Sequence, residues 1–262
     1  MSSSPVLWHI DSRGVATITF NRPEVNNAYD AAFIAGVLSA MDDRGKEPSL
    51  RVVVLRGAGK HFQAGADLKW IRSLTARSPE DNLAASRDTA TVVRRLNELP
   101  VPTVALVQGA CFGGGTGIVA ACDVVIAADN ALFSIAETRW GLIASIIIPQ
   151  LADAIGVRQV RRYAQTGERF DAHEARRIGL VHEVVAPGEL EAAGARVVDH
   201  LLQNAPGANA QTKALALECA RGKMSDGTFD RLVLQHAAKR QSEEAAEGLA
   251  SFAERRAARW YR

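Results

Sequence analysis

Two short stretches of the chain combine small-residue backbone turns with a single carboxylate. The first is HFQAGADLK (residues 61–69), and the second is GACFGGGTGIVAACD (residues 109–123) followed by FSIAETRWG (residues 133–141). Backbone N–H groups that converge on one point can hold a developing oxyanion. A nearby carboxylate, here Glu137, can move a proton or activate water. This equipment suits chemistry that passes through an enolate next to a carbonyl group.

The glycine cluster at residues 113–117 follows an expected strand and opens an expected helix. The first N–H groups of a helix lack internal partners, and glycines let another molecule approach that backbone closely. The cluster alone is equally consistent with tight helix packing, because it lacks the Lys-Ser/Thr ending of a P-loop and the full dinucleotide fingerprint. In the first stretch, Asp67 has the type and position of a helix N-cap. Asp123 is expected to be a structural cap or turn residue.

The spacing of apolar residues predicts the elements that must position these turns. Strands and helices alternate over roughly the first 185 residues and helices follow, which predicts an α/β core with a helical appendage. The expected strands are residues 6–10, 15–20, 51–56, 103–107, 124–127, 132–135 and 180–185. The expected helices are residues 30–41, 88–98, 113–121 and most of the chain from residue 145, including an alanine- and charge-rich solvated helix at 243–262.

Composition limits the class of protein. The 262 residues are 47% hydrophobic and 23% charged, which is ordinary for a soluble globular protein. A net charge of +2 is too small to predict a nucleic-acid partner. The three cysteines lack CxxC spacing, so we expect reduced thiols and a cytoplasmic protein.

Several other classes are not expected from the sequence. The first residues show no signal peptide, and the longest central apolar run, residues 142–149, is too short to cross a membrane. The six histidines are scattered without an i,i+4 pair, so we expect no metal site. The chain contains no Gly-x-Ser-x-Gly motif, which argues against a serine hydrolase.

Taken in order, four motifs resemble the crotonase family, the enoyl-CoA hydratase/isomerase superfamily. The motifs are ITFNRPEVNNAYD, RVVVLRGAGKHFQAGADLK, LPVPTVALVQGACFGGGTGIVAACDVVIAADNALFSIAETRWG and ERFDAHEARRIGLVHEVV. The resemblance covers roughly residues 6–190 and implies a ββα spiral core at residues 1–195. It also implies a C-terminal helical region at residues 196–262 that makes trimer contacts, so we expect a homotrimer or a dimer of trimers.

The resemblance further implies an acyl-CoA substrate, carried as a coenzyme A thioester, with no permanently bound cofactor. The family's oxyanion hole corresponds to the N–H groups of Ala66 and Gly114, and its second catalytic glutamate corresponds to Glu137. The implied coenzyme A contacts are Val25, Asn26 and Ala28 at the adenine end, together with Ala64, Asp67 and Leu68.

The chain departs from the hydratase pattern at one catalytic position. Hydratases of this family typically carry two glutamates, and the first should stand at position 117, where this chain has Gly117. Position 117 is one helical turn beyond Gly114, so a side chain there is expected to point into the site. The segment WGLIASIIIP also replaces a glycine-rich turn common in hydratases, and its apolar bulk is expected to reshape the acyl pocket. We place Gly117, Arg139 and Trp140 among the substrate-binding residues.

A single-glutamate site with an arginine shortly after the glutamate is similar to bacterial hydratases of leucine and acyclic terpene breakdown. Those enzymes act on methylglutaconyl-CoA and isohexenylglutaconyl-CoA. We therefore expect water addition to the 2,3 double bond of an enoyl-CoA, with 3-methylglutaconyl-CoA as the model substrate and Arg139 beside its distal carboxylate.

Three alternatives to hydration remain open. They are enoyl-CoA isomerisation, other enolate chemistry of the family, and a non-catalytic acyl-CoA-binding or RNA-binding role. Dehalogenation is not expected, because Ser145 stands where the family's dehalogenase has its nucleophilic aspartate.

Overall fold

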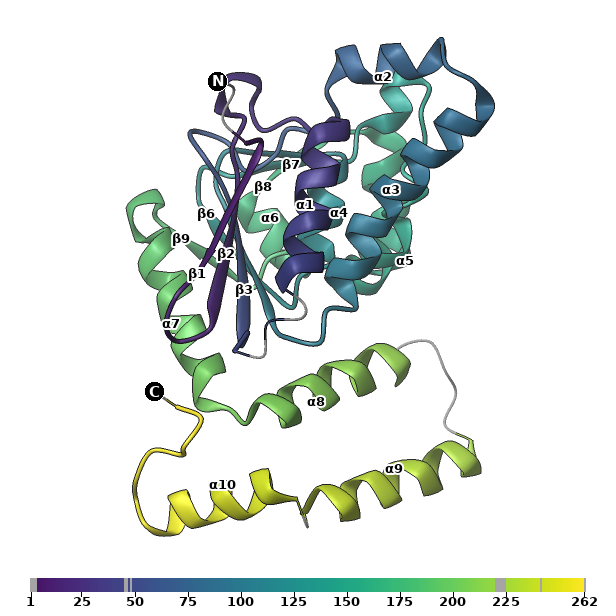
Figure 1. The fold of residues 1–262 in the computed structure, drawn as a ribbon. Coiled ribbons are helices and arrows are strands. Elements are labelled where there is room, and N and C mark those ends of the chain that lie inside the picture. The colour runs from purple at the N-terminus through teal and green to yellow at the C-terminus, as the bar shows by residue number, and fades with distance from the viewer. Residues whose placement is uncertain (1–3, 45–46, 48, 220–224, 241, 262) are drawn as a thin grey trace.

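The computed structural model describes residues 4–44, 47, 49–219, 225–240 and 242–261. Its strands are β1 (Val6–Ile10), β2 (Val15–Phe20), β3 (Val52–Gly57), β4 (Thr103–Val107), β5 (Ala110–Phe112), β6 (Val124–Ala128), β7 (Leu132–Ser134), β8 (Arg169–Asp171) and β9 (Glu183–Val185). They form a six-stranded sheet in the order β1-β2-β3-β4-β6-β9 and a three-stranded sheet in the order β5-β7-β8 (Figure 1). In the larger sheet β1 and β2 are antiparallel and all later neighbours are parallel.

Helices lie on both faces of the larger sheet and continue beyond it. They are α1 (Ala31–Arg44), α2 (Leu68–Thr75), α3 (Pro79–Asn97), α4 (Gly114–Ala120), α5 (Ile148–Thr166), α6 (Ala172–Arg177), α7 (Leu190–Gln203), α8 (Pro206–Cys219), α9 (Asp226–Arg240) and α10 (Glu243–Ala253). Short 3-10 helices occupy Pro23–Val25, Glu137–Trp140 and Pro187–Glu189. Among the residues described, no helix is both long and apolar enough to cross a bilayer.

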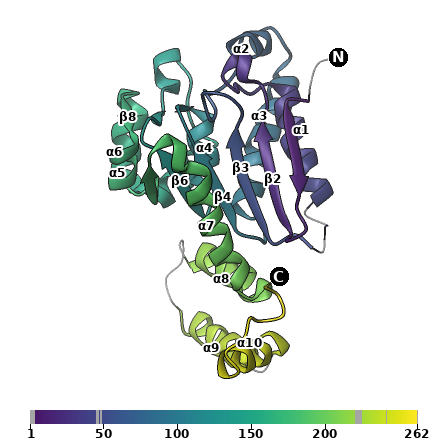
Figure 2. The same ribbon diagram turned by 90° about the vertical axis from the view of Figure 1, so that its left-hand side faces the viewer.

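The central strands are apolar on both faces because both faces are covered. In β3, Val53 and Leu55 belong to the large core that includes residues of α1, α3, α4 and α5. Val52 and Val54 alternate with them and belong to a second core completed by residues of α7. Figure 2 shows α7 lying across the sheet, with α8, α9 and α10 extending away from the core. Continuous apolar strands of this kind are typical of parallel sheets buried on both sides.

Most of the expected elements are confirmed, with differences at their ends. The helix expected at residues 88–98 begins earlier, at Pro79, because the Ser78 hydroxyl caps it by accepting a hydrogen bond from the Asp81 N–H. The chain beyond residue 145 also contains the short strand β8, which the sequence analysis missed. The proposed division between residues 195 and 196 falls within α7.

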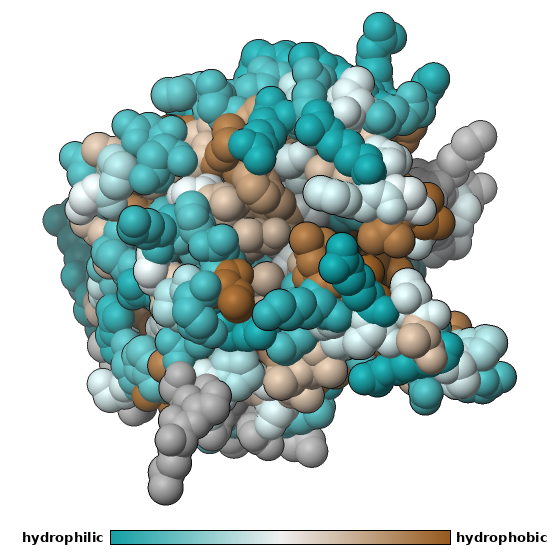
Figure 3. Space-filling view, turned by 90° about the horizontal axis from the view of Figure 1, so that it is seen from above, coloured by the Kyte–Doolittle hydropathy of each residue, from teal (hydrophilic) through white to brown (hydrophobic). Residues whose placement is uncertain are grey.

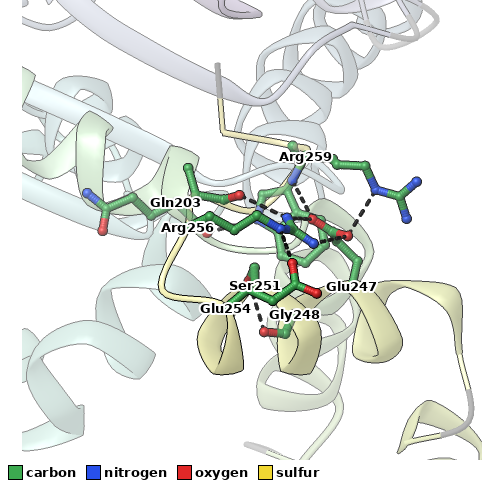
Figure 4. A network of polar contacts seen from close by, with 9 residues as sticks. Gln203, Glu247, Gly248, Ser251, Glu254, Arg256 and Arg259 are labelled. Atoms are coloured by element: carbon green, nitrogen blue, oxygen red, sulfur yellow. Dashed lines mark hydrogen bonds and ion pairs between the residues drawn. The ribbon is translucent and has the colours of Figure 1, made fainter.

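The solvated helix expected at residues 243–262 is wrong beyond Ala253. The segment 254–261 leaves the helix and folds back over α10, where Glu247 and Ser251 are buried. Glu247 accepts hydrogen bonds from the Arg256 guanidinium at 2.7 and 3.2 Å and from the N–H and side chain of Arg259 at 2.8 and 3.0 Å (Figure 4). Two positive charges therefore offset the cost of burying this carboxylate. Arg262 lies outside the described residues.

A second set of contacts ties the end of the chain to the larger sheet. Arg51, directly before β3, donates to the carbonyls of Trp260 (2.6 Å), Leu202 (3.1 Å) and Asn204 (3.0 Å). Lys213 of α8 donates to the Asp123 carboxylate at 2.7 Å. The helical appendage is thus anchored to the core by charged side chains that bind backbone carbonyls and a carboxylate.

Replacing Glu247 with Gln should lower the melting temperature at neutral pH. The Arg256 hydrogen bond, followed by that of the Arg259 N–H, lowers the pKa of Glu247 from 4.5 to about 2. A carboxyl whose pKa is lowered by folding stabilises the folded state above its unfolded pKa, and this contribution disappears as the pH falls towards the folded value. The Tm difference between wild type and Glu247→Gln should therefore shrink as the pH falls from about 5 to about 2. Differential scanning calorimetry across this range measures it.

Glu254→Gln is the matched control for this prediction. Glu254 is exposed and contacts Arg256 alone among the described side chains, so its replacement should change Tm little. A Tm difference for Glu247→Gln that stays constant with pH would contradict the assigned role of its charge.

Candidate active site

A cavity of about 810 Å³ opens beside α2 and α3. Its wall includes Ala66, Gly114 and Glu137, the three residues predicted to be catalytic. Much of the remaining wall is apolar and comes from α1, α3 and residues 142–147. Seen from above Figure 1, the surface has recesses around which hydrophobic side chains gather (Figure 3). The structure thus brings the two predicted turns and the carboxylate to one apolar cavity.

The peptide group between Gly65 and Ala66 is held in one orientation from behind. The Gly65 carbonyl accepts hydrogen bonds from the Tyr29 N–H (3.0 Å) and from the buried side-chain amide of Gln63 (2.9 Å). The N–H and C=O of a trans peptide point in opposite directions, so the Ala66 N–H points away from these two donors. It has no hydrogen-bond acceptor among the described residues. Gly65 itself has φ +92°, a conformation that favours glycine.

The peptide group between Gly113 and Gly114 is arranged in the same way. The Gly113 carbonyl accepts hydrogen bonds from the N–H (2.9 Å) and the hydroxyl (2.6 Å) of Thr116, which is buried. The Gly114 N–H points in the opposite direction and also lacks an acceptor within the described part of the chain. Gly113 has φ +51°. Each free donor therefore follows a glycine in the left-handed region.

The two turns are hydrogen bonded to one another, which fixes their separation. The Gln63 N–H donates to the Ala110 carbonyl at 3.1 Å, and the Phe112 N–H donates to the Gln63 carbonyl at 2.9 Å. This short parallel bridge pairs Gln63 with Cys111. The free N–H groups of Ala66 and Gly114 thus belong to one connected backbone unit.

Glu137 begins the 3-10 helix that follows β7, and its carboxylate reaches the glycine turn. A Cβ atom at Gly113 would lie 2.9 Å from Glu137 Oε1, so the glycine leaves room for the carboxylate. The other oxygen, Oε2, is buried without a hydrogen-bond partner among the described residues. Burial raises the pKa of Glu137 above its ordinary value of 4.5, partly offset by a hydrogen bond from its own backbone N–H. A carboxylate with one buried, unpartnered oxygen is costly for folding and typical of a functional group.

The space beside Gly117 is filled by a hydrocarbon side chain. A Cβ atom at Gly117 would lie 2.1 Å from Cγ2 and 2.6 Å from Cβ of Ile147. Gly117 is buried and is not part of the cavity wall, whereas Ile147 is. The substrate contact expected at Gly117 stays a prediction, but in this geometry Ile147, and not Gly117, lines the cavity. A glutamate at position 117 would meet the side chain of Ile147, which occupies that space.

The predicted adenine-end contacts lie on a loop that is held to the core. Asn27 is fully buried and donates hydrogen bonds to two backbone carbonyls of segment 58–61, at 2.9 and 2.8 Å. On the same loop Asn26 is exposed, Val25 is half-buried and Ala28 is buried. The loop therefore presents a fixed backbone and few side chains.

The second predicted coenzyme A segment leads into α2. The Ala64 N–H donates to the Asn26 carbonyl at 3.1 Å, which joins the two predicted segments. Asp67 accepts hydrogen bonds from two N–H groups of the first turn of α2, so its predicted N-cap role is confirmed. Its carboxylate also pairs with Arg22 at 3.4 Å. Leu68, at the start of α2, is 58% exposed and lines the cavity.

Two arginines line the cavity near Glu137. Arg139 packs against Gly167, where an added Cβ would lie 2.8 Å from its Nε. Arg169, from β8, lies over the Phe112 ring at 5.3 Å from the ring centroid. Neither guanidinium has an ion-pair partner in the part of the chain that the structure describes. Trp140, which is 67% exposed, stands beside Arg139 on the same wall.

Sequence reasoning missed five residues that line this cavity or hold its backbone turns from behind. They are Tyr29, Gln63, Thr116, Ile147 and Arg169. Gln63 and Thr116 are polar residues inside small-residue turns, which is a signal for side chains that bind turn backbone. Tyr29 and Arg169 stand inside motifs quoted for the resemblance, but no residue spacing connects them to the site. Ile147 belongs to the apolar segment expected to reshape the acyl pocket, but no local signal predicts its contact with Gly117, 30 residues away.

Gly117→Ala should destabilise the fold by roughly 1–3 kcal/mol, because the added methyl group overlaps Ile147 in a packed core. The cost should fall when Ile147→Ala is already present, since the overlap is then removed. A double-mutant cycle by urea unfolding should give a favourable coupling of roughly 0.5–3 kcal/mol.

Gly188→Ala is the control, because no atom lies within 4 Å of its added Cβ and its φ is not in the left-handed region. Additive effects of Gly117→Ala and Ile147→Ala would mean that Ile147 does not fill this space.

The enoyl-CoA hydratase/isomerase family model matches residues 11–262. The mitochondrial Delta(3,5)-Delta(2,4)-dienoyl-CoA isomerase of Dictyostelium discoideum is 32% identical, over 94% of this chain and 87% of its own. Hydroxycinnamoyl-CoA hydratase-lyase of Pseudomonas fluorescens is 34% identical, over 74% and 71%. A solved enoyl-CoA hydratase from Shewanella pealeana has a TM-score of 0.93 at 34% identity and covers 98% of this chain and 96% of its own. With this match over nearly its whole length, the chain is an enzyme of the enoyl-CoA hydratase/isomerase family and has the crotonase fold.

Proposed function

We propose that the cavity hydrates an enoyl-CoA thioester by adding water across its 2,3 double bond. The observation that carries this proposal is the buried Oε2 of Glu137, which lacks a partner and lies in the same cavity as two free N–H groups. An enolate needs hydrogen-bond donors at its oxygen and a base near its carbons. The two N–H donors and the Glu137 carboxylate all line the same, largely apolar cavity.

In this mechanism Ala66 and Gly114 donate their N–H groups to the thioester oxygen. Glu137 takes a proton from a water molecule as that water forms a bond to C3, and the electron pair of the double bond moves to give an enolate. The protonated Glu137 then delivers its proton to C2 and the carbonyl re-forms. One carboxylate suffices for this sequence, because it accepts and returns the same proton.

A single carboxylate also suits isomerisation, in which Glu137 would move a proton between C2 and C4. The apolar Ile147 in place of a second acid favours this alternative, because fewer polar groups remain to hold water. Incubation with crotonyl-CoA and 3-methylglutaconyl-CoA, followed by mass spectrometry and by ¹H NMR to locate the double bond, distinguishes the possibilities. Hydration adds the mass of one water, isomerisation leaves the mass unchanged and moves the double bond, and a non-catalytic relative changes neither.

The proposed coenzyme A site runs along the two joined segments, with Val25, Asn26 and Ala28 on one and Ala64, Asp67 and Leu68 on the other. Two observations support this site: the hydrogen bond from the Ala64 N–H to the Asn26 carbonyl, which joins the segments, and the N-cap that fixes the start of α2. Asp67 contributes through its N-cap and its ion pair with Arg22. The small side chain of Ala64, which lines the cavity, suits the close approach of a long, narrow ligand.

We propose a branched, glutaconyl-type acyl group, such as that of 3-methylglutaconyl-CoA, as the substrate. Arg139 and Arg169 support this choice, because two guanidinium groups without ion-pair partners in the described chain line the cavity near Glu137. A carboxylate at the far end of the acyl group would supply their counter-charge. Charge-assisted hydrogen bonds of this kind are roughly twice as strong as neutral ones.

We also propose that copies of the chain assemble with one another through the helical appendage. Apolar side chains of α9 and α10 are exposed, including Leu234 (70%), Leu249 (69%) and Phe252 (85%). Large exposed apolar patches typically mark interfaces. A trimer or a dimer of trimers, as the family resemblance implies, would cover them.

Glu137→Gln should reduce hydration by roughly 10²- to 10⁴-fold, the usual contribution of a general base. The amide keeps the size of the side chain, so KM should change little. Because burial raises the pKa of Glu137 above 4.5, the wild-type kcat/KM should fall as the pH drops through a value above 4.5. This acidic limb should be missing from the variant.

Glu98→Gln provides the control, since Glu98 is exposed at the end of α3 and pairs with Arg94. Near-normal turnover in Glu137→Gln would assign the chemistry to another residue.

Arg139→Ala should raise KM for 3-methylglutaconyl-CoA by roughly tenfold or more, because a hydrogen bond to a charged group is worth about 1.5–3 kcal/mol. KM for crotonyl-CoA, which has no distal carboxylate, should stay near the wild-type value. Arg158→Ala, on the exposed surface of α5, is the control. An equal rise in KM for both substrates would show that Arg139 does not bind the distal carboxylate.

A further inference from the structure

The backbone of Tyr29 is joined to the segment that contains the Ala66 donor. The Tyr29 N–H donates to the Gly65 carbonyl at 3.0 Å, and the Tyr29 carbonyl accepts from the Asp67 N–H at 2.8 Å. Tyr29 and Ala66 therefore face one another as a parallel bridge. Two backbone hydrogen bonds thus fix the backbone of Tyr29, from which its side chain departs, relative to Ala66.

The Tyr29 ring lies against the second donor. A Cβ atom at Gly114 would stand 2.7 Å from Cε1 and 3.4 Å from the hydroxyl oxygen of Tyr29. The Trp70 ring packs edge-on against the Tyr29 ring, with centroids 5.7 Å apart. The Tyr29 ring thus occupies space that a side chain at Gly114 would need, and its hydroxyl lies next to the position of that missing side chain.

The Tyr29 hydroxyl makes no hydrogen bond within the described part of the chain, although the residue is half-buried. The other hydroxyls of the cavity wall differ from it. Those of Ser134 and Thr89 donate to backbone carbonyls, and Ser86 and Ser145 are exposed. Tyr29 lines the cavity, so its hydroxyl is available to donate to a ligand atom there.

The Tyr29 phenol is protonated, as a hydrogen-bond donor must be. Burial, and then the negative charge of Glu137, raise the pKa of Tyr29 from 10 to about 12. The phenol therefore keeps its proton at every pH at which the enzyme would work. It can donate a hydrogen bond but does not compete with Glu137 as a base.

We propose that the Tyr29 hydroxyl is a third hydrogen-bond donor to the thioester oxygen, beside the N–H groups of Ala66 and Gly114. This inference rests on the proposed binding of an acyl-CoA with its carbonyl between those two groups. No proton leaves Tyr29 during the reaction. Its hydrogen bond strengthens as negative charge moves from the double bond onto the oxygen and weakens again when Glu137 protonates C2.

Tyr29→Phe tests the proposal, because it keeps the ring against Gly114 and Trp70 and removes one hydroxyl. Turnover of the hydrated substrate should fall by roughly 10²-fold, the usual cost of one oxyanion donor, with KM little changed. The direct measurement is the carbonyl stretch of bound butyryl-CoA labelled with ¹³C at the thioester carbon. This saturated probe cannot be hydrated. In wild type the stretch should shift to lower frequency on binding, and in Tyr29→Phe the shift should be smaller.

The outcomes separate this inference from the proposed function. Tyr261→Phe, which removes a hydroxyl from the C-terminal segment outside the cavity, should behave as wild type in both measurements. Reduced turnover in Tyr29→Phe with an unchanged carbonyl stretch would place the hydroxyl on water instead, and overturn the proposal. Unchanged turnover and stretch would overturn it as well. A wild type that shifts the stretch but hydrates no enoyl-CoA would refute hydration and leave the donor role of Tyr29 standing.

Discussion

The site depends on the orientation of two peptide groups. A peptide plane cannot point its N–H inward unless its carbonyl points outward, and a carbonyl that points outward must itself be satisfied when buried. Gln63 and Tyr29 do this for Gly65, and Thr116 does it for Gly113. The donors of the cavity are therefore set by hydrogen bonds behind it, and remain in place without a ligand.

The larger fold explains why the two turns lie together. Strands β3 and β4 are parallel neighbours, so the segments that follow them leave from the same edge of the sheet. The pairing of Gln63 with Cys111 then continues the alignment beyond the sheet. Glu137 arrives from β7, which pairs with β5 next to the glycine turn. The pairing of parallel strands thus brings the two N–H donors and Glu137 together, independently of how the side chains of the cavity pack.

Much of this arrangement follows from local sequence patterns. The apolar strands and the small-residue turns predict the α/β core, and the resemblance of the motifs to the family implies that Ala66, Gly114 and Glu137 share a site. What depends on long-range packing could not be predicted. Position 117 was expected to face the site from helical spacing alone, but Ile147 covers it. The segment after α10 folds back because Glu247 binds Arg256 and Arg259. Helix propensity considers each residue by itself and does not predict these contacts.

The contact between Gly117 and Ile147 also bears on how this chain could evolve. A single change that installs an acid at position 117 meets a packed side chain and first reduces folding stability, so selection would remove it before any catalytic benefit appeared. A smaller residue at position 147 opens the space but gains nothing until the acid arrives. The two positions are therefore epistatic, and one-carboxylate and two-carboxylate sites are separated by a fitness valley. A lineage with this pair of residues is expected to diversify through the acyl pocket and its arginines, where single substitutions are free to act.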